Sequence, residues 1–338
     1  MNASLPNTLA STLRAFFGDY LPTLRGLSPH TIRSYRDSLT LLLRFVATQQ
    51  RRDVAILDVG DVTAEMVMAF LTHLEQARRT SVTTRNCRLA ALHIFFRFLA
   101  TQHPDRLDQV QRIVGIPFKW ARPRPIEYLE YEELDSVLAV VDRATSTGRR
   151  DYALLATLFN TGARVQEFLD ARAMDLQLSK PYQIRLLGKG RKTRTCPLWP
   201  QTALLLRALC ADRQLDLRSD ARIFVNHRGA PLTRFGVRFI LAKHLRTAAA
   251  ACPSLARKKL HPHSLRHSTA VHLLKSEVDL PTIAHWLGHA SVNTTNRYAT
   301  IDLDMKRKAL ARAQPPSMLA RRPTWRRNAT ILEWLEAL

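Results

Sequence analysis

Apolar residues at helical spacing, interrupted by few glycines, are the feature that most constrains what this chain can fold into. From Leu9 onward, leucine and aromatic side chains return every three or four positions, which is the period of one face of an α-helix. The 338 residues include only 11 glycines, whereas an average usage of about 7% would give about 24. A glycine-poor chain that is rich in leucine and alanine favours helices.

The N-terminal part carries the start signals of several helices. Ser28 precedes a proline, so it predicts an N-cap followed by proline at the first helical position. Thr63 and Ser81 stand at the start of two further apolar faces. We expect these helices to form a small all-helical domain over residues 8–102. The basic residues expected on the outer face of its last helix are Arg85, Arg88 and Arg97.

The chain changes character after this domain. Residues 103–125 contain four prolines among basic residues that include Lys119, a composition typical of a connector between domains. A second domain is expected over 126–314. The tail, residues 315–338, holds several arginines followed by a short apolar helix near 331–335.

The second domain mixes helices with a little sheet. Two short strands are expected at 184–187 and 193–198, joined by a basic turn with glycines where tight turns need them. Helical faces precede and follow this hairpin, among them 204–209, 235–245, 264–274, 282–287 and 303–313. The sequence therefore predicts a mainly α fold of the α+β class, with a small antiparallel sheet in the second domain.

A formal net charge of +23 is the first sign of a partner. Such an excess attracts nucleic acid or an anionic membrane surface, although it can also serve solubility alone. No stretch reaches the roughly 18 to 20 apolar residues of a membrane span, so we expect no membrane partner and favour nucleic acid. The cysteines form no CxxC pair and the N-terminus lacks the layout of a signal peptide, which predicts a cytoplasmic protein, associated with the nucleoid when bound to DNA.

Three short clusters and the hairpin in the second domain could act on a phosphodiester. Two arginines offer planar, permanently charged forks that suit phosphate oxygens. A lysine on the hairpin could donate a proton, and two histidines could hold or carry protons. A tyrosine hydroxyl becomes a nucleophile once its proton is removed. These candidates are Arg164, Lys189, His263, Arg266, His289 and Tyr298.

Taken singly, each of these residues has a plainer explanation. An arginine after Thr-Gly is usually at the surface or ion-paired, and a single tyrosine usually belongs to the core or the surface. The histidines within 261–272 and 285–289 could suggest zinc, but no nearby carboxylate or cysteine completes either set. Acidic motifs for two metal ions and a GxxxxGK[ST] motif for ATP are both missing. We therefore expect no metal ion and no other cofactor.

Order and spacing together change this assessment. An arginine is followed by a lysine in a Gly-Lys-Gly turn, by His-x-x-Arg, by Leu-Gly-His, and by a tyrosine nine residues after that histidine. This order resembles the tyrosine recombinase or phage integrase family, and most of all its Xer-type bacterial enzymes and their transposon-borne relatives. The resemblance extends over residues 9–312. In the N-terminal half, residues 27–35 and 88–99 look like two helices of the family's core-binding, SAM-like DNA-binding domain.

The resemblance implies a role for each motif residue. Arg164 and Arg266 would clamp the scissile phosphate, and Lys189 would protonate the leaving 5′ oxygen. His263 would accept or donate a proton. His289 would donate a hydrogen bond to the phosphate.

The resemblance also implies the nucleophile and the product. Tyr298 would attack phosphorus, which leaves a 3′-phosphotyrosyl link and a free 5′-hydroxyl. Glu167, three residues after Arg164, matches the family's usual acidic partner and would orient the site without taking part in the chemistry. The enzyme would need neither ATP nor a metal ion.

By resemblance, the partner is duplex DNA that carries a specific recombination site. Four protomers would assemble on two paired sites, as a homotetramer or together with a second recombinase. The tail extends past the end of compact Xer-type enzymes, which favours DNA integration or transposition by a mobile element. Two alternatives stay open, a type IB topoisomerase-like enzyme that relaxes DNA and a non-catalytic DNA-binding regulator. The expected DNA contacts are Arg85, Arg88 and Lys119, although a solvated helix face explains the first two equally well.

Overall fold

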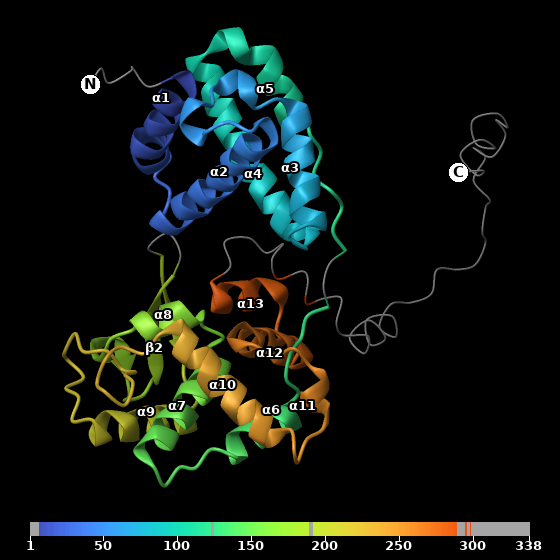
Figure 1. Ribbon diagram of the computed structural model, residues 1–338. Helices are drawn as coiled ribbons and strands as arrows, with labels where there is room; N and C mark the ends of the chain where they lie inside the picture. Colours follow the sequence, from blue (N-terminus) through green and yellow to red (C-terminus); the bar gives the residue numbers. More distant parts are fainter. Residues whose placement is uncertain (1–6, 123–124, 189–191, 289–294, 296–297, 299–338) are drawn as a thin grey trace, which may run out of the picture. The chain divides into compact units, whose positions relative to one another are not determined.

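The computed structural model describes residues 7–122, 125–188 and 192–288, together with residues 295 and 298. The chain divides into two compact units, residues 1–124 and 125–338, which Figure 1 shows in blue to teal and in green to orange. Each unit has its own hydrophobic core. The expected mainly α fold with a small antiparallel sheet is confirmed.

All the regular secondary structure among the described residues of the first unit is helical. Ser28, Thr63 and Ser81 are N-caps, as the sequence predicts, and each side chain accepts a hydrogen bond from the backbone N–H three residues later. The elements are α1 (Thr8–Ala15), a π-helical stretch (Phe16–Leu24), α2 (Pro29–Gln50), α3 (Ala64–Gln76), α4 (Val82–Gln102), α5 (Leu107–Val114), and 3-10 turns at Val54–Ile56, Val59–Asp61 and Pro104–Arg106.

Helix α4 supplies much of the core of this unit. Leu89, Leu92 and Leu99 are fully buried, and Phe95 packs edge-on against Phe16 with 5.2 Å between the ring centroids. Burial of a leucine or phenylalanine side chain stabilises a fold by about 1.5 to 3 kcal/mol. The large apolar residues of α4 are therefore explained by packing inside the unit.

The expectation that residues 103–125 form a connector throughout is wrong. Residues Leu107–Val114 form α5, and Val110 and Ile113 are buried in the core of the first unit. Apolar residues at helical spacing signal this helix, but prolines lie before and after it and basic residues surround it. The helix packs against α4 and α3. The sequence alone does not show that these two helices offer an apolar surface to it.

The second unit combines a small sheet with helices. Strands β1 (Leu176–Gln177), β2 (Gln183–Leu187) and β3 (Thr193–Pro197) are antiparallel neighbours in that order, and Ile184 pairs with Cys196. The hairpin tip at 189–191, the expected helix at 303–313 and the tail at 315–338 lie outside the described residues. The elements are α6 (Tyr131–Ala139), α7 (Ser146–Thr161), α8 (Val165–Asp170), a 3-10 turn (Ala173–Asp175), β1 (Leu176–Gln177), β2 (Gln183–Leu187), β3 (Thr193–Pro197), α9 (Pro200–Asp212), α10 (Arg234–Ala248), α11 (Ser254–Arg257), α12 (Pro262–Lys275) and α13 (Leu280–Leu287).

Two buried helices, α7 and α12, position the functional end of this unit. Leu154 and Leu155 on α7 are fully buried, and α12 packs directly against this helix. Thr269 on α12 donates its hydroxyl to the Phe159 carbonyl at 2.6 Å, so the last turn of α7 is fixed to α12. Helix α13 lies beside α12 (Figure 1). Within the described ranges, no helix has the length and apolar character needed to cross a membrane.

Candidate active site

The end of α7 sets the position of the first candidate arginine. Helix α7 ends at Gly162, which has a left-handed conformation with φ of +56°. A Cβ at this position would lie 2.5 Å from the Leu287 side chain and 3.2 Å from that of Thr269. Glycine is therefore required at position 162 both by the left-handed backbone conformation and by the close approach of these two side chains. The turn brings Arg164 to the N-cap of α8, in front of Glu167.

Arg266 lies on α12 and is buried beside the same turn. Its Nη1 donates a hydrogen bond to the Gly162 carbonyl at 2.8 Å, and the residue is only 1% exposed. Burial, reinforced by the positive charges of Arg164 and Arg194, lowers the pKa of Arg266 to about 10. The guanidinium remains charged at neutral pH, and a bound anion would stabilise that buried charge.

Glu167 holds two guanidinium groups at once. Its Oε1 accepts a hydrogen bond from Arg164 Nη1 at 2.5 Å, and its Oε2 accepts one from Arg194 Nη1 at 2.9 Å. Burial by itself would raise the pKa of Glu167, but the hydrogen bonds and charges of the two arginines outweigh burial and hold this pKa below its ordinary value. Glu167 is thus an ionised carboxylate that orients both arginines.

Arg194 joins the sheet to the end of α13. It lies on β3, is 7% exposed at its side chain, and donates Nε to the Trp286 carbonyl at 3.0 Å. A Cβ on Gly288 would lie 2.9 Å from Arg194 Nη1. Gly288 has φ of +66°, so glycine there both ends α13 and leaves room for the guanidinium.

The hydroxyl of Tyr298 lies next to His267. Tyr298 Oη and His267 Nδ1 are 2.8 Å apart, and the two residues are 1% and 8% exposed. His267 follows Arg266 on α12, and its ring packs edge-on against that of His263 with 4.6 Å between centroids. Tyr298 is also close enough to Arg266 for the two groups to interact electrostatically.

Arg164, Glu167, Arg194, Arg266 and Tyr298 form what we call the arginine–tyrosine cluster. The cluster contains three guanidinium groups and one carboxylate, that of Glu167, so its described part has a surplus of positive charge. The Nη2 atoms of Arg194 and Arg266 are buried and have no hydrogen-bond partner among the described residues. Buried donors are nearly always paired. An anion with several oxygens would satisfy both the charge and the donors.

The structure brings most of the candidate catalytic residues together. Arg164, Arg266 and Tyr298 belong to the arginine–tyrosine cluster, and His263 contacts it through His267. Lys189 and His289 lie outside the described residues. Among the described residues, no group of three or more His, Cys, Asp or Glu side chains is arranged to hold a metal ion.

The expectation that Arg85 faces outward is wrong. Arg85 is 5% exposed, its Nε lies 3.7 Å from a carboxylate oxygen of Glu75, and its Nη1 donates to the Pro117 carbonyl at 3.1 Å. The side chain therefore ties α4 to α3 and to the segment after α5. Arg88 is partly buried and Arg97 is exposed. Lys119 is exposed and its Nζ lies 2.6 Å from Glu75.

Sequence reasoning missed two residues of the site, Arg194 and His267. Arg194 lies in the hairpin strand where basic residues are common, so no local signal separates it from a solvated arginine. His267 does carry a signal, because it lies four residues after His263 and hence on the same helix face. That signal was considered only as part of a zinc site.

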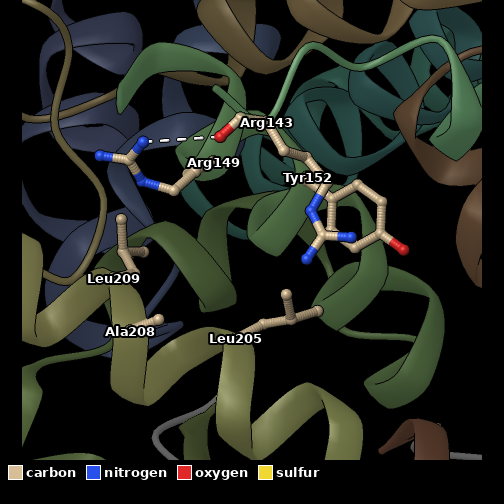
Figure 2. A pocket seen from close by; sticks show the side chains of 6 residues that line it. All are labelled: Arg143, Arg149, Tyr152, Leu205, Ala208 and Leu209. Atoms are coloured by element: carbon tan, nitrogen blue, oxygen red, sulfur yellow. Dashed lines mark hydrogen bonds between the residues drawn. The ribbon is translucent and has the colours of Figure 1, made fainter. Parts of the chain in front are cut away.

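A separate cavity of about 340 Å³ lies at the other end of α7. Figure 2 shows Arg143 over the ring of Tyr152, with 4.6 Å from its Cζ to the ring centroid. Arg149 at the same cavity pairs with Asp212 at 2.6 Å. About ten residues of helix, roughly 15 Å, separate Tyr152 from Gly162, so this cavity is distinct from the arginine–tyrosine cluster.

Fold and cluster together define a class of protein, one that can hold a phosphodiester between buried arginines beside a tyrosine hydroxyl. The sequence pattern of the phage integrase family matches residues 127–304, and that of the phage integrase N-terminal SAM-like domain matches residues 8–103. The chain belongs to the phage integrase family, the family of the tyrosine recombinases.

Curated relatives support this membership over nearly the whole chain. A Sinorhizobium fredii protein described as an integrase/recombinase, y4rC, is 39% identical over 332 residues, which cover 98% of each chain. The tyrosine recombinase XerC of Oceanobacillus iheyensis is 33% identical over 312 residues, which cover 88% of this chain and 94% of that protein.

Solved structures agree with the fold. The XerH site-specific recombinase bound to its difH substrate is 25% identical, with a TM-score of 0.65 over 83% of this chain and 79% of that one. The Tn1549 transposon integrase in complex with transposon right end DNA is 15% identical, with a TM-score of 0.66 over 88% of this chain and 98% of that one. The second similarity concerns the fold alone.

Proposed function

We propose that this chain cleaves and rejoins duplex DNA at a specific recombination site, with Tyr298 as the nucleophile. The observation that carries the proposal is a tyrosine hydroxyl beside buried arginines whose Nη2 donors have no acceptor among the residues that the structure describes. A phosphodiester would supply an acceptor for the arginine N–H groups, through its oxygens, and an electrophile for the tyrosine hydroxyl, through its phosphorus. The relatives' names, integrase and tyrosine recombinase, support the same reaction.

The proposed reaction balances without a cofactor. The O–H bond of Tyr298 breaks and its proton passes to a histidine of α12, while the bond between Tyr298 Oη and phosphorus forms and the bond between phosphorus and O5′ breaks. The departing O5′ takes a proton from Lys189, and Arg164 with Arg266 stabilises the negative charge on the non-bridging oxygens. His289 donates a hydrogen bond to the same phosphate. A 5′-hydroxyl from another strand reverses these steps, so neither ATP nor a metal ion is required.

The burial of the cluster adds a condition. Arg266 and Tyr298 are each 1% exposed, so a DNA phosphate reaches them only after the surrounding chain moves aside. We propose that DNA binding supplies the free energy for this opening, since the phosphate pairs with buried charge and with donors that have no acceptor in the described part of the chain.

The remaining assignments extend the proposal to the whole chain. We assign DNA binding to residues 8–102 together with Lys119 in the segment after α5, and catalysis to residues 126–314. We propose that four protomers, of this chain or with a second recombinase, act on two paired sites in the cytoplasm. A mobile element that integrates or transposes is the proposed context, and the tail, residues 315–338, is the feature that favours it.

Covalent trapping tests this proposal. The full-length protein is incubated in EDTA with DNA from the region around its own gene, in a form nicked near the cleavage point so that the cut strand cannot be resealed. We expect a 3′-linked protein–DNA adduct on denaturing gels from the wild-type chain and none from Tyr298→Phe. A matched Tyr152→Phe variant should form the adduct at the wild-type rate, because Tyr152 lies at the other end of α7.

The same gels separate the alternatives. An adduct that EDTA abolishes, or one that persists in Tyr298→Phe, would contradict the mechanism. Relaxation of supercoiled plasmid without any preferred site would indicate a topoisomerase. Sequence-specific DNA binding without an adduct, even after neighbouring gene products are added, would indicate a regulator.

A further inference from the structure

The Tyr298 hydroxyl must lose a proton during cleavage, and α12 presents two histidines on one face. His263 is exposed, whereas His267, one helical turn further along, is buried. The family motif draws attention to His263. In this structure His267 Nδ1 lies 2.8 Å from the Tyr298 hydroxyl.

We propose that His267 is the catalytic base that accepts the phenol proton of Tyr298. The inference rests on the proposed function and names a residue that the motif assignment leaves without a role. Heavy-atom separations of about 2.6 to 3.2 Å are the range in which a side chain can take a proton directly. The separation between Nδ1 and Oη lies inside that range.

The surroundings hold His267 in this position. Its helix is fixed to α7 by the Thr269 hydroxyl, which donates to the Phe159 carbonyl. Ser268 accepts a hydrogen bond from the Leu129 backbone N–H at 2.8 Å, which ties the same turn to the segment before α6. The His263 ring packs edge-on against the His267 ring. Because Arg266 is the preceding residue, one turn of helix fixes both the base and a phosphate clamp.

The proton balance is simple. His267 starts as a neutral imidazole with its proton on Nε2 and a lone pair on Nδ1. The bond between hydrogen and Tyr298 Oη breaks and an Nδ1–H bond forms, while Oη bonds to phosphorus and O5′ leaves. When a 5′-hydroxyl attacks the phosphotyrosine, Nδ1 returns the proton to Oη. The leaving oxygen O5′ is served separately, by Lys189.

The assignment of His267 to Tyr298 Oη and of Lys189 to O5′ can be tested with a sulfur leaving group, because a thiolate leaves without protonation by an acid. The substrate is the DNA that yields the Tyr298-linked adduct, prepared with oxygen or with sulfur as the 5′ bridging atom. We expect His267→Asn to slow cleavage of both substrates by about 10²- to 10⁴-fold, the usual contribution of a general base, with DNA affinity unchanged. Lys189→Ala should be slow with oxygen and recover with sulfur.

A histidine outside the arginine–tyrosine cluster serves as the control for His267. His285→Asn, an exposed histidine change on α13, is expected to cleave at the wild-type rate. His267→Asn that cleaves as fast as this control would overturn the inference. Recovery of His267→Asn by the sulfur substrate would also overturn it, because the residue would then serve the leaving group.

A second measurement covers the possibility that the asparagine variant folds poorly. His267→Gln is made in parallel, and melting temperature and DNA affinity are recorded for both variants. A fluorinated tyrosine at position 298, ionised at the assay pH, has no proton to transfer. With this residue at position 298, the wild-type chain and the folded His267 variant should cleave DNA at the same rate. If the His267 variant still cleaves more slowly than the wild-type chain by the same factor, His267 is not the base.

The two proposals fail in distinguishable ways. If the wild-type chain forms no adduct, the proposed function is overturned and this inference with it. If the wild-type chain forms the adduct and the His267 variants are equally fast, only this inference is overturned.

Discussion

At the scale of single residues, Arg266 carries a buried positive charge that destabilises the unbound protein and that a bound anion would stabilise. Its guanidinium is buried, and one of its nitrogens has no partner in the described part of the chain. Burial, with the charges of Arg164 and Arg194, lowers its pKa from the ordinary arginine value to about 10. A shift of this size corresponds to about 3 kcal/mol at about 1.36 kcal/mol per unit.

The sign of this effect gives a prediction for Arg266. Below pH 10 the folded protein contains the full buried charge, and the destabilisation fades only as the pH rises above 10, where the unfolded chain still binds the proton. At neutral pH, Arg266→Gln removes this charge and loses one hydrogen bond, to Gly162, of about 1 kcal/mol. We expect the free energy of unfolding in urea to rise by about 1 to 2 kcal/mol while cleavage is lost.

Arg150 provides the matched control for this prediction. Its Nη2 lies 2.6 Å from the buried carboxylate of Asp151, so Arg150→Gln leaves a buried acid with one partner fewer. That variant should be less stable than the wild-type chain. A loss of stability in Arg266→Gln as large as that in Arg150→Gln would show that Arg266 is held mainly as a structural residue.

At the scale of elements, the site depends on how α7, α12 and α13 meet. Gly162 ends α7, its carbonyl binds Arg266, and the two neighbouring helices approach the position where a Cβ would be. The positions of Arg164 and Arg266 therefore depend on how these three helices pack at the turn.

We expect Gly162→Ala to lower the free energy of unfolding by about 2 to 3 kcal/mol. About 1 to 2 kcal/mol comes from the left-handed backbone, and the remainder from contact with Leu287 and Thr269. Cleavage should fall more than DNA affinity does, because the displaced turn moves Arg164 and Arg266. Urea denaturation, binding and single-turnover cleavage measure the three effects.

Gly229→Ala separates the two contributions. Gly229 has φ of +77° and no atom within 4 Å of an added Cβ, so that variant has backbone strain without a clash. It should lose about 1 to 2 kcal/mol of stability and keep its cleavage rate. Equal effects of both substitutions on cleavage would contradict the role given to the Gly162 turn.

At the scale of the whole molecule, charge is the dominant property. With a net charge of +23, we expect DNA binding to weaken steeply with salt, because each phosphate contact releases counterions. With six to ten such contacts, affinity should fall by about 10³- to 10⁵-fold between about 50 and 200 mM salt. Filter binding or fluorescence anisotropy over this range measures the slope.

Individual basic residues should contribute differently to that slope. Lys119 is exposed, and if it contacts a phosphate, Lys119→Gln lowers the slope by about 1. Arg85→Gln is the comparison, since Arg85 is buried and bonded inside the first unit. It should reduce stability and leave the slope unchanged. A slope that responds to Arg85 and not to Lys119 would reverse these assignments.

The amino-acid sequence by itself determined the helical class, the two-part organisation and the order of the candidate catalytic residues. Helical periodicity, the Ser28, Thr63 and Ser81 caps and the hairpin glycines are local signals, and the structure contains the elements that they predict within the described residues. Local patterns suffice there because capping and periodicity depend on residues within a few positions of one another.

Only the tertiary structure decided which side chains share one site. Arg194 meets Glu167 across 27 positions, and Arg266 meets Gly162 across 104. His267 meets Tyr298 across 31 positions. Arg85 turned inward because α3 and the segment after α5 supply its partners. Such contacts depend on which helix faces pack together. The packing is set by the burial of apolar area over the whole unit, so it cannot be predicted from any short stretch of sequence.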